Sequence, residues 1–134
     1  KKDRDYTVSY SANKGIGTAK VTVTGKGSYT GKITKTFKIN PQGQSVSAKG
    51  DKSGKKIAVT LAKHSSNSGY QVSYADNSGF KNSKSLWLSG NSKNKGTIKG
   101  LKSKKTYYVK ARDYKTIGKT KVYGKWSAVK KVSI

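Results

Sequence analysis

The chain has 134 residues, neither cysteine nor methionine, and 30 lysine or arginine residues against five acidic ones, which gives a formal net charge of +25. Without cysteine the chain forms neither disulfides nor thiolate metal sites, so its core must be held by packing. No apolar run is long enough for a signal peptide or a membrane span. Because residue 1 is not an initiator methionine, we expect an excised or processed segment of a larger protein.

The cations are almost all lysine, with Arg4 and Arg112 as the two arginines. Lysine is a hydrated point charge, whereas arginine makes the bidentate contacts that read bases or clamp phosphate. A lysine surface therefore attracts polyanions without discriminating among them, and we expect no specific nucleic-acid partner. An AT-rich genome and a well-solvated surface are the alternative explanation for so many lysines.

The first third of the chain alternates with period two. Residues 6–11, 17–24 and 33–39 are rich in threonine and valine, and a glycine-rich turn at 25–31 joins the last two. This pattern predicts three strands. Residues 40–44 then break the alternation and hold the single proline, as is typical of a linker.

After the linker the pattern predicts strands at 56–62, 69–75, 84–89, 95–99, 105–114 and 126–134, and no segment favours a helix. The sequence thus predicts an all-β protein. The residues expected to face inward are Ile57, Val59, Leu61, Tyr70, Val72, Tyr74, Tyr107, Val109, Ala111, Trp126, Val132 and Ile134.

The two parts differ in completeness. Residues 42–134 provide about seven strands, the number that a β-sandwich needs, and are long enough to bury a core. Residues 1–41 provide three strands, too few to close a sandwich, and are expected to be an incomplete antiparallel β module.

Residues 100–111 carry the strongest fold signal. A leucine at 101 precedes a tyrosine at 107 by six positions, and apolar/polar alternation follows at once. This spacing is typical of the corner between the fifth and sixth strands of a sandwich. We expect Leu101 to fill the core at the loop and the Tyr107 hydroxyl to bond back to the loop backbone.

The second part resembles a bacterial fibronectin type III domain. The motifs that carry the resemblance are Gly69-Tyr-Gln-Val-Ser-Tyr, Thr97-Ile-Lys-Gly-Leu, Lys105-Thr-Tyr-Tyr-Val-Lys-Ala-Arg and Tyr123-Gly-Lys-Trp-Ser. The tryptophan usual in the second strand of that family is missing here, and Val59 and Leu61 occupy its region. Versions with this wording resemble repeats in secreted and wall-attached proteins of gut Firmicutes.

The first part resembles the closing half of a bacterial Ig-like repeat, through Asp5-Tyr-Thr-Val-Ser-Tyr, Gly17-Thr-Ala-Lys-Val-Thr-Val, Gly27-Ser-Tyr-Thr-Gly and Thr36-Phe-Lys-Ile. Together the two resemblances imply a spacer, adhesion or binding role outside the cell, with no catalytic residues. They also suggest a likeness to irisin, a fibronectin type III polypeptide of animals that is shed and acts as a hormone.

Residue types that support catalysis are sparse. Asp3 and Asp5 are the close acidic pair, in a basic N-terminus where a solvated charge cluster is expected. His64 is the single histidine and lies in a polar loop, so neither a triad nor a multi-histidine metal site is predicted. Gly15-Ile-Gly and Gly118-Lys-Thr lack the spacing of phosphate loops and are interpreted as turns. We predict no enzyme, metal or cofactor.

An intramolecular Lys–Asn crosslink of the kind found in some Gram-positive Ig-like domains needs a buried lysine. Lys35 and Lys130 fall at nominally inward positions of their strands. Burying a charge is costly, so placement at a sheet edge is the more common explanation.

Exposed aromatic residues among lysines are the positive signal for recognition. Trp87 and Tyr108 alternate out of phase with the apolar positions, so they are expected to face solvent or a partner. The predicted contact surface combines them with the lysines of neighbouring turns and strands, Lys102, Lys104, Lys105 and Lys110. An outward tyrosine with good β propensity is the alternative interpretation of Tyr108.

The leading hypothesis is a non-enzymatic, secreted or wall-associated binding module. Its partner would be a host cell-surface protein, such as an integrin-type receptor, or an acidic glycan or wall polymer, without insertion into the membrane. In a finer version the segment is released by proteolysis and acts as a receptor ligand. The alternative is a passive spacer or a polyanion-binding module of a larger surface protein or hydrolase.

Overall fold

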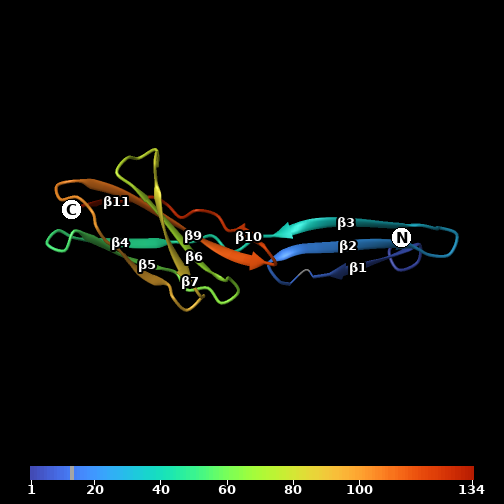
Figure 1. Ribbon diagram of the computed structural model, residues 1–134. Helices are drawn as coiled ribbons and strands as arrows, with labels where there is room; N and C mark the ends of the chain where they lie inside the picture. Colours follow the sequence, from blue (N-terminus) through green and yellow to red (C-terminus); the bar gives the residue numbers. More distant parts are fainter. Residues whose placement is uncertain (13) are drawn as a thin grey trace. The chain divides into compact units, whose positions relative to one another are not determined.

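The computed structural model describes residues 1–12 and 14–134, and every regular element in these ranges is a β-strand (Figure 1). No helix among the described residues could cross a membrane. The chain divides into two compact units, Lys1–Asn40 and Pro41–Ile134.

The first unit is an antiparallel sheet of three strands, β1 (Tyr6–Ser11), β2 (Gly17–Gly25) and β3 (Lys32–Ile39), in the order β1-β2-β3. The three strands expected from the alternation are therefore confirmed. Register places Val8 opposite Val23, and Val23 opposite Ile33. Since residues directly opposite share a face, one face of the sheet is mainly apolar and the other carries threonine, serine and lysine.

The second unit is a two-layer antiparallel sandwich. One layer has the order β4-β5-β8, formed by β4 (Val46–Asp51), β5 (Lys56–Leu61) and β8 (Lys95–Ile98). The other has the order β10-β9-β6-β7, with β11 also paired to β9. Its strands are β6 (Gly69–Ala75), β7 (Lys84–Ser89), β9 (Thr106–Ile117), β10 (Thr120–Tyr123) and β11 (Lys130–Ser133). The predicted all-β sandwich is confirmed.

The core between the layers contains ten of the residues expected to face inward, and Val46, Ile98 and Leu101 join them. Tyr74 is partly buried and packs against this cluster. Tyr70 is completely buried, and its hydroxyl donates to the Asn91 carbonyl at 2.6 Å. A buried tyrosine of this size, with its hydroxyl satisfied, supplies aromatic bulk in a core whose β5 carries Val59 and Leu61.

The corner before β9 has the geometry that the spacing predicts. Leu101 and Tyr107 are 6% and 8% exposed, and the Lys102 backbone N–H donates to the Tyr107 hydroxyl at 2.9 Å. Gly100 adopts a φ of 70°, a conformation that glycine reaches without a steric penalty. The corner thus closes the core at the connection between β8 and β9.

The expected inward position of Trp126 is wrong. The last strand begins at Lys130, not at residue 126, and Trp126 is only partly buried on the surface. The Ser127 hydroxyl accepts from the Ala111 N–H at 2.9 Å, and the Ser127 N–H donates to the Ala111 carbonyl at 2.7 Å. A side chain here replaces a backbone group of the ladder, so the alternation changes phase and Trp126 turns outward.

The sequence pattern did not predict two of the strands. β4 has a weak pattern, Val-Ser-Ala-Lys-Gly-Asp, and β10 follows β9 after a tight turn at Gly118.

The Lys–Asn crosslink hypothesis required a buried lysine, but Lys35 and Lys130 are both exposed. Each lies on a strand that pairs on one side within the described residues, where a long side chain reaches water.

Candidate functional site

The candidate site is the outer face of the β10-β9-β6-β7 layer. Along β9, Tyr107, Val109 and Ala111 point into the core, so Lys110 and Arg112 point outward. Gln71 of β6 lies opposite Arg112 on one side and opposite Trp87 of β7 on the other. The register therefore aligns Trp87, Gln71 and Arg112 in one row across three strands.

A stack of alternating cations and rings, which we call the cation–aromatic ladder, covers this face. It consists of Phe80, Lys110, Trp126, Arg112 and Tyr123. The Lys110 Nζ lies 4.2 Å from the Phe80 ring centroid and 4.7 Å from that of Trp126. The Arg112 guanidinium lies 4.2 Å from the Trp126 centroid and 3.6 Å from that of Tyr123. All four contacts are within the range of cation–π attraction.

Arg112 is held in place by more than its rings. Its Nε donates to the Gln71 Oε1 at 2.8 Å. Burial lowers the pKa of Arg112 below its ordinary value, although Tyr123 acts in the opposite direction. An arginine still carries its charge at neutral pH. With rings on both sides, Arg112 anchors the segment after β10 to the sheet and offers only its edge to a ligand.

A second group on the same face is open to a partner. The Trp87 ring meets the Tyr114 ring edge-on, with centroids 5.4 Å apart, and the Lys121 Nζ lies 5.8 Å from the Trp87 centroid. Tyr114 is buried and fits over Gly69, where a Cβ atom would come within 2.8 Å of the Tyr114 hydroxyl. Trp87 is 44% exposed. This cluster of Trp87, Tyr114 and Lys121, which we call the Trp87 cluster, places an exposed lysine beside an exposed ring that a second ring supports.

The structure divides the residues that sequence assigned to the contact surface. Trp87 is exposed, as expected, and Tyr108 and Lys110 are half-buried on β9. Lys102, Lys104 and Lys105 are exposed in the turn before β9, seven or more residues from Arg112, and therefore about 20 Å from the Trp87 row along the strand. Lys105 is paired with Asp76 at 3.1 Å. Whether any of these residues contacts a partner stays a prediction.

Sequence reasoning missed most of the ladder. Arg112 was missed although it alternates in phase with Tyr108 and Lys110 along β9, and that alternation could have identified it as an outward residue. Nothing local indicates Phe80, in a loop, or Trp126, whose orientation depends on the phase change at Ser127.

A buried polar cluster, also missed, lies at the end of the sandwich that receives the linker. The completely buried Asp113 carboxylate binds the His64 Nδ1 at 2.5 Å and accepts from the Gln44 Nε2 at 2.6 Å. Gln44 also accepts from the Ala62 N–H at 2.8 Å and donates to the Ala62 carbonyl at 3.1 Å. The cluster thus fastens the segment after Pro41 to the end of β5.

In hydrolases, an acid–histidine pair of this kind orients the catalytic base toward a nucleophile. The neighbouring hydroxyl of Tyr70 bonds to the backbone N–H of His64 at 3.0 Å, not to its ring. No group of three or more metal-binding side chains occurs among the described residues. The contacts of the cluster are those of a structural fastening.

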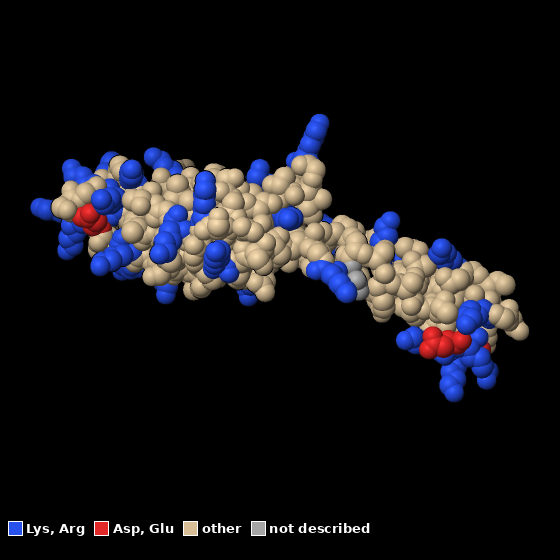
Figure 2. All heavy atoms as spheres, turned by 90° about the horizontal axis from the view of Figure 1, so that it is seen from below, with Lys and Arg blue, Asp and Glu red and all other residues tan. Residues whose placement is uncertain are grey.

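Positive charge is spread over the surface that Figure 2 shows. Figure 2 shows lysine and arginine side chains scattered over both units on the face in view, with few acidic side chains among them. Scattered charge attracts a polyanion from many directions but does not define an epitope. The Trp87 cluster is therefore a better candidate for a defined contact site than the scattered lysines.

No family model and no curated protein matches the chain. Among solved structures, it is similar to the FN1-FN3 domains of chicken CNTN1, with a TM-score of 0.59 and 18% identity over 90% of this chain and 43% of that one. A multi-domain segment of titin matches with a TM-score of 0.44 and 14% identity, over 96% of this chain and 49% of that one. The chain spans less than half of the CNTN1 structure. The first likeness shows the fold, that of fibronectin type III and Ig-like modules.

Proposed function

We propose that this chain is a non-enzymatic, extracellular binding module that uses the Trp87 cluster to contact a host cell-surface protein. The observation that carries the proposal is the 44% exposure of Trp87 on the sheet, beside Lys121 and supported by Tyr114. Tryptophan and tyrosine dominate the energetic centres of protein interfaces because they bury a large area with little loss of freedom.

The finer form of the proposal concerns origin and action. The module belongs to a bacterial secreted or wall-associated protein and, once released by proteolysis, acts as an irisin-like ligand for a receptor of the integrin type. The sequence contains no Arg-Gly-Asp, so recognition would depend on surface shape and charge. Detection of this polypeptide, separate from its parent, in culture supernatant would support release, and finding only the intact parent would contradict it.

The test is a surface-binding assay with immobilised receptor ectodomains, heparin and teichoic acid. Trp87→Ala should weaken receptor binding about tenfold or more, as truncation of a central aromatic does. Lys121→Met should weaken it more than Lys49→Met, which removes the same charge from β4 in the opposite layer. Equal losses for the two lysine variants, with no effect of Trp87→Ala, would contradict the proposed site.

A second function is favoured by the charge of +25, which supports binding of acidic glycans or wall polymers. Binding of this kind should fall steeply with salt and respond equally to the loss of any exposed lysine. Indifference to receptors and polyanions at all salt concentrations would instead support a passive spacer.

A further inference from the structure

Among the described residues, the apolar face of the three-stranded sheet is partly open to solvent, although Ala19, opposite Phe37, is completely buried. Its residues, which we call the apolar face, are Tyr6, Val8, Tyr10, Val21, Val23, Ile33, Lys35 and Phe37. Tyr10 and Ile33 are each 61% exposed, and Phe37 is 44% exposed. Opposite pairings such as Thr22 with Thr34 form the polar face of the same sheet. An antiparallel sheet with this division normally packs its apolar side against a second layer.

We propose that this face packs against the same face of a second copy of the chain, forming a two-layer sandwich across a two-fold axis. A group of exposed apolar side chains on one face of a sheet is typical of an interaction site. The first unit is a single sheet of three strands, the smallest number that can be stable when it has an apolar face to bury. Pairing two copies supplies the missing layer from the chain itself.

The register makes the face complementary to itself. We call residues that lie opposite one another across the three strands a row. A two-fold axis parallel to the strands places β1 of one copy over β3 of the other, and β2 over β2. The rotation does not shift the copies along the strands, so each row lies over the same row of the other copy. In the row Val8–Val23–Ile33, valine then meets isoleucine. In the row Tyr10–Val21–Lys35, the ammonium of Lys35 meets the Tyr10 ring of the other copy. The single cation within the face thereby gains a partner.

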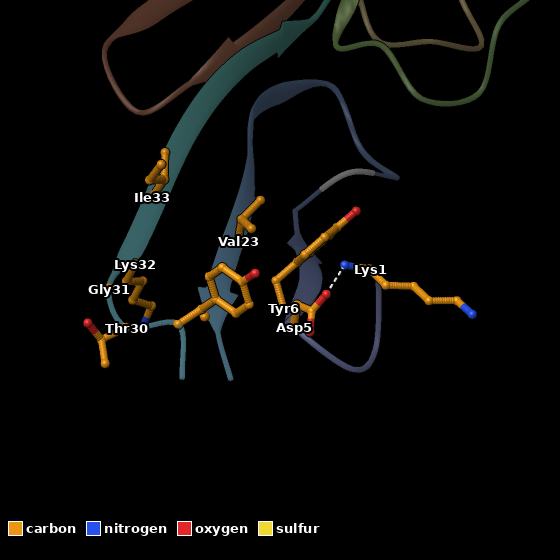
Figure 3. A pocket seen from close by; sticks show the side chains of 10 residues that line it. Lys1, Asp5, Tyr6, Val23, Thr30, Gly31, Lys32 and Ile33 are labelled. Carbon is orange, nitrogen blue, oxygen red and sulfur yellow. Dashed lines mark hydrogen bonds and ion pairs between the residues drawn. The ribbon is translucent and has the colours of Figure 1, made fainter. Parts of the chain in front are cut away.

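One end of the face is concave. A cavity of about 410 Å³ is lined by Tyr6, Val23, Tyr29 and Ile33, among other residues. Figure 3 shows Val23 between Ile33 of β3 and Tyr6 of β1. The same two-fold rotation places the β1 edge of each copy, which carries Tyr6, over the β3 edge of the other, which carries Ile33. The cavity therefore accommodates part of the β1 edge of the second copy.

Size and charge predict how strong the pairing is. A face three strands wide and about eight residues long measures roughly 14 Å by 26 Å, and stacking two removes on the order of 1,000 Å² from water. This is near the lower limit of specific interfaces, so we expect a dissociation constant between about 10 µM and 1 mM.

The polar face carries Lys20, Lys32 and Lys38, whose repulsion between copies is screened by salt. The dimer should therefore strengthen as salt rises, opposite to polyanion binding.

Sedimentation equilibrium of the full chain up to about 1 mM, in about 50 mM and 500 mM NaCl, tests the proposal. We expect a reversible dimer that is favoured by the higher salt. Ile33→Lys should weaken it at least tenfold, whereas Thr34→Lys, which adds the same charge on the polar face, should change it less than twofold. A monomer under all conditions, association that weakens with salt, or equal effects of the two variants would overturn the proposal.

A crosslinking measurement does not depend on how well Ile33→Lys folds. The chain has no cysteine, so Val21→Cys introduces one thiol on the apolar face next to the proposed axis, and Thr22→Cys introduces one on the polar face. Sheets pack about 10 Å apart, a gap that a short bis-maleimide spans. Crosslinked dimer should form with Val21→Cys and not with Thr22→Cys, and equal yields would overturn the proposal.

Discussion

Removing one oxygen atom from the corner before β9 tests how this sandwich closes. In Tyr107→Phe the ring keeps its buried position, but the Lys102 N–H loses the acceptor that it contacts at 2.9 Å. A buried hydrogen bond contributes about 1 kcal/mol net. Because this hydrogen bond is only partly buried, the cost should stay near that value and not reach the larger penalty of a fully buried orphan.

The expected result is a free energy of unfolding lower by about 1 kcal/mol, equivalent to a fall in Tm of roughly 4–8 °C for a domain of this size. Urea denaturation followed by tryptophan fluorescence isolates the second unit, because Trp87 and Trp126 both lie there. The m-value should not change, since the same surface is exposed on unfolding.

Tyr108→Phe is the matched control for this experiment. It removes the same atom from the neighbouring residue, which is half-buried on the outer face and whose hydroxyl makes no hydrogen bond within the described part of the chain. Its effect should stay within about 0.5 kcal/mol. Equal losses for the two variants would show that the corner hydrogen bond does not stabilise the fold.

Three further predictions concern other features of the second unit. Trp126→Ala removes a ring contacted by both Lys110 and Arg112 and should cost about 2 kcal/mol or more, measured by urea denaturation, whereas a core position would cost about 3–5 kcal/mol. Asp113→Ala removes the acceptor shared by the buried Gln44 and the partly buried His64 and should cost about 1–3 kcal/mol, with faster amide exchange at residues 44 and 62. Hydrogen bonding from Lys105, and secondarily from Asn77, holds the pKa of Asp76 below 3.8, so Lys105→Met should raise that pKa in an NMR titration. Because the folded pKa is lowered, this carboxylate stabilises the fold above about pH 4, and the contribution is lost as pH falls through the folded pKa.

Local pattern was sufficient wherever a residue's role follows from its neighbours in the chain. Period-two alternation located β1, β2, β3 and β6 because side chains of a strand face alternate sides. The leucine–tyrosine spacing predicted the corner because the loop length fixes which backbone amide the hydroxyl reaches. The same reasoning placed Trp87 outward, and the structure agrees.

The rest depends on contacts between segments that are distant in sequence. Trp126 lies on the surface because the Ser127 hydroxyl, and not a backbone carbonyl of the last strand, accepts the hydrogen bond from the Ala111 N–H. No pattern within 126–134 reveals that replacement. Asp113, His64 and Gln44 come from three separate segments and meet only when the sandwich closes.

The composition and alternation of this sequence determined an all-β chain with a cationic exterior, because strand periodicity and charge are local properties. Which aromatic rings stack on Arg112, which lysine lies beside Trp87, and which face of the first sheet lacks a cover were decided by register and strand order. These depend on long-range pairing, where a shift of one residue exchanges the two faces of a strand.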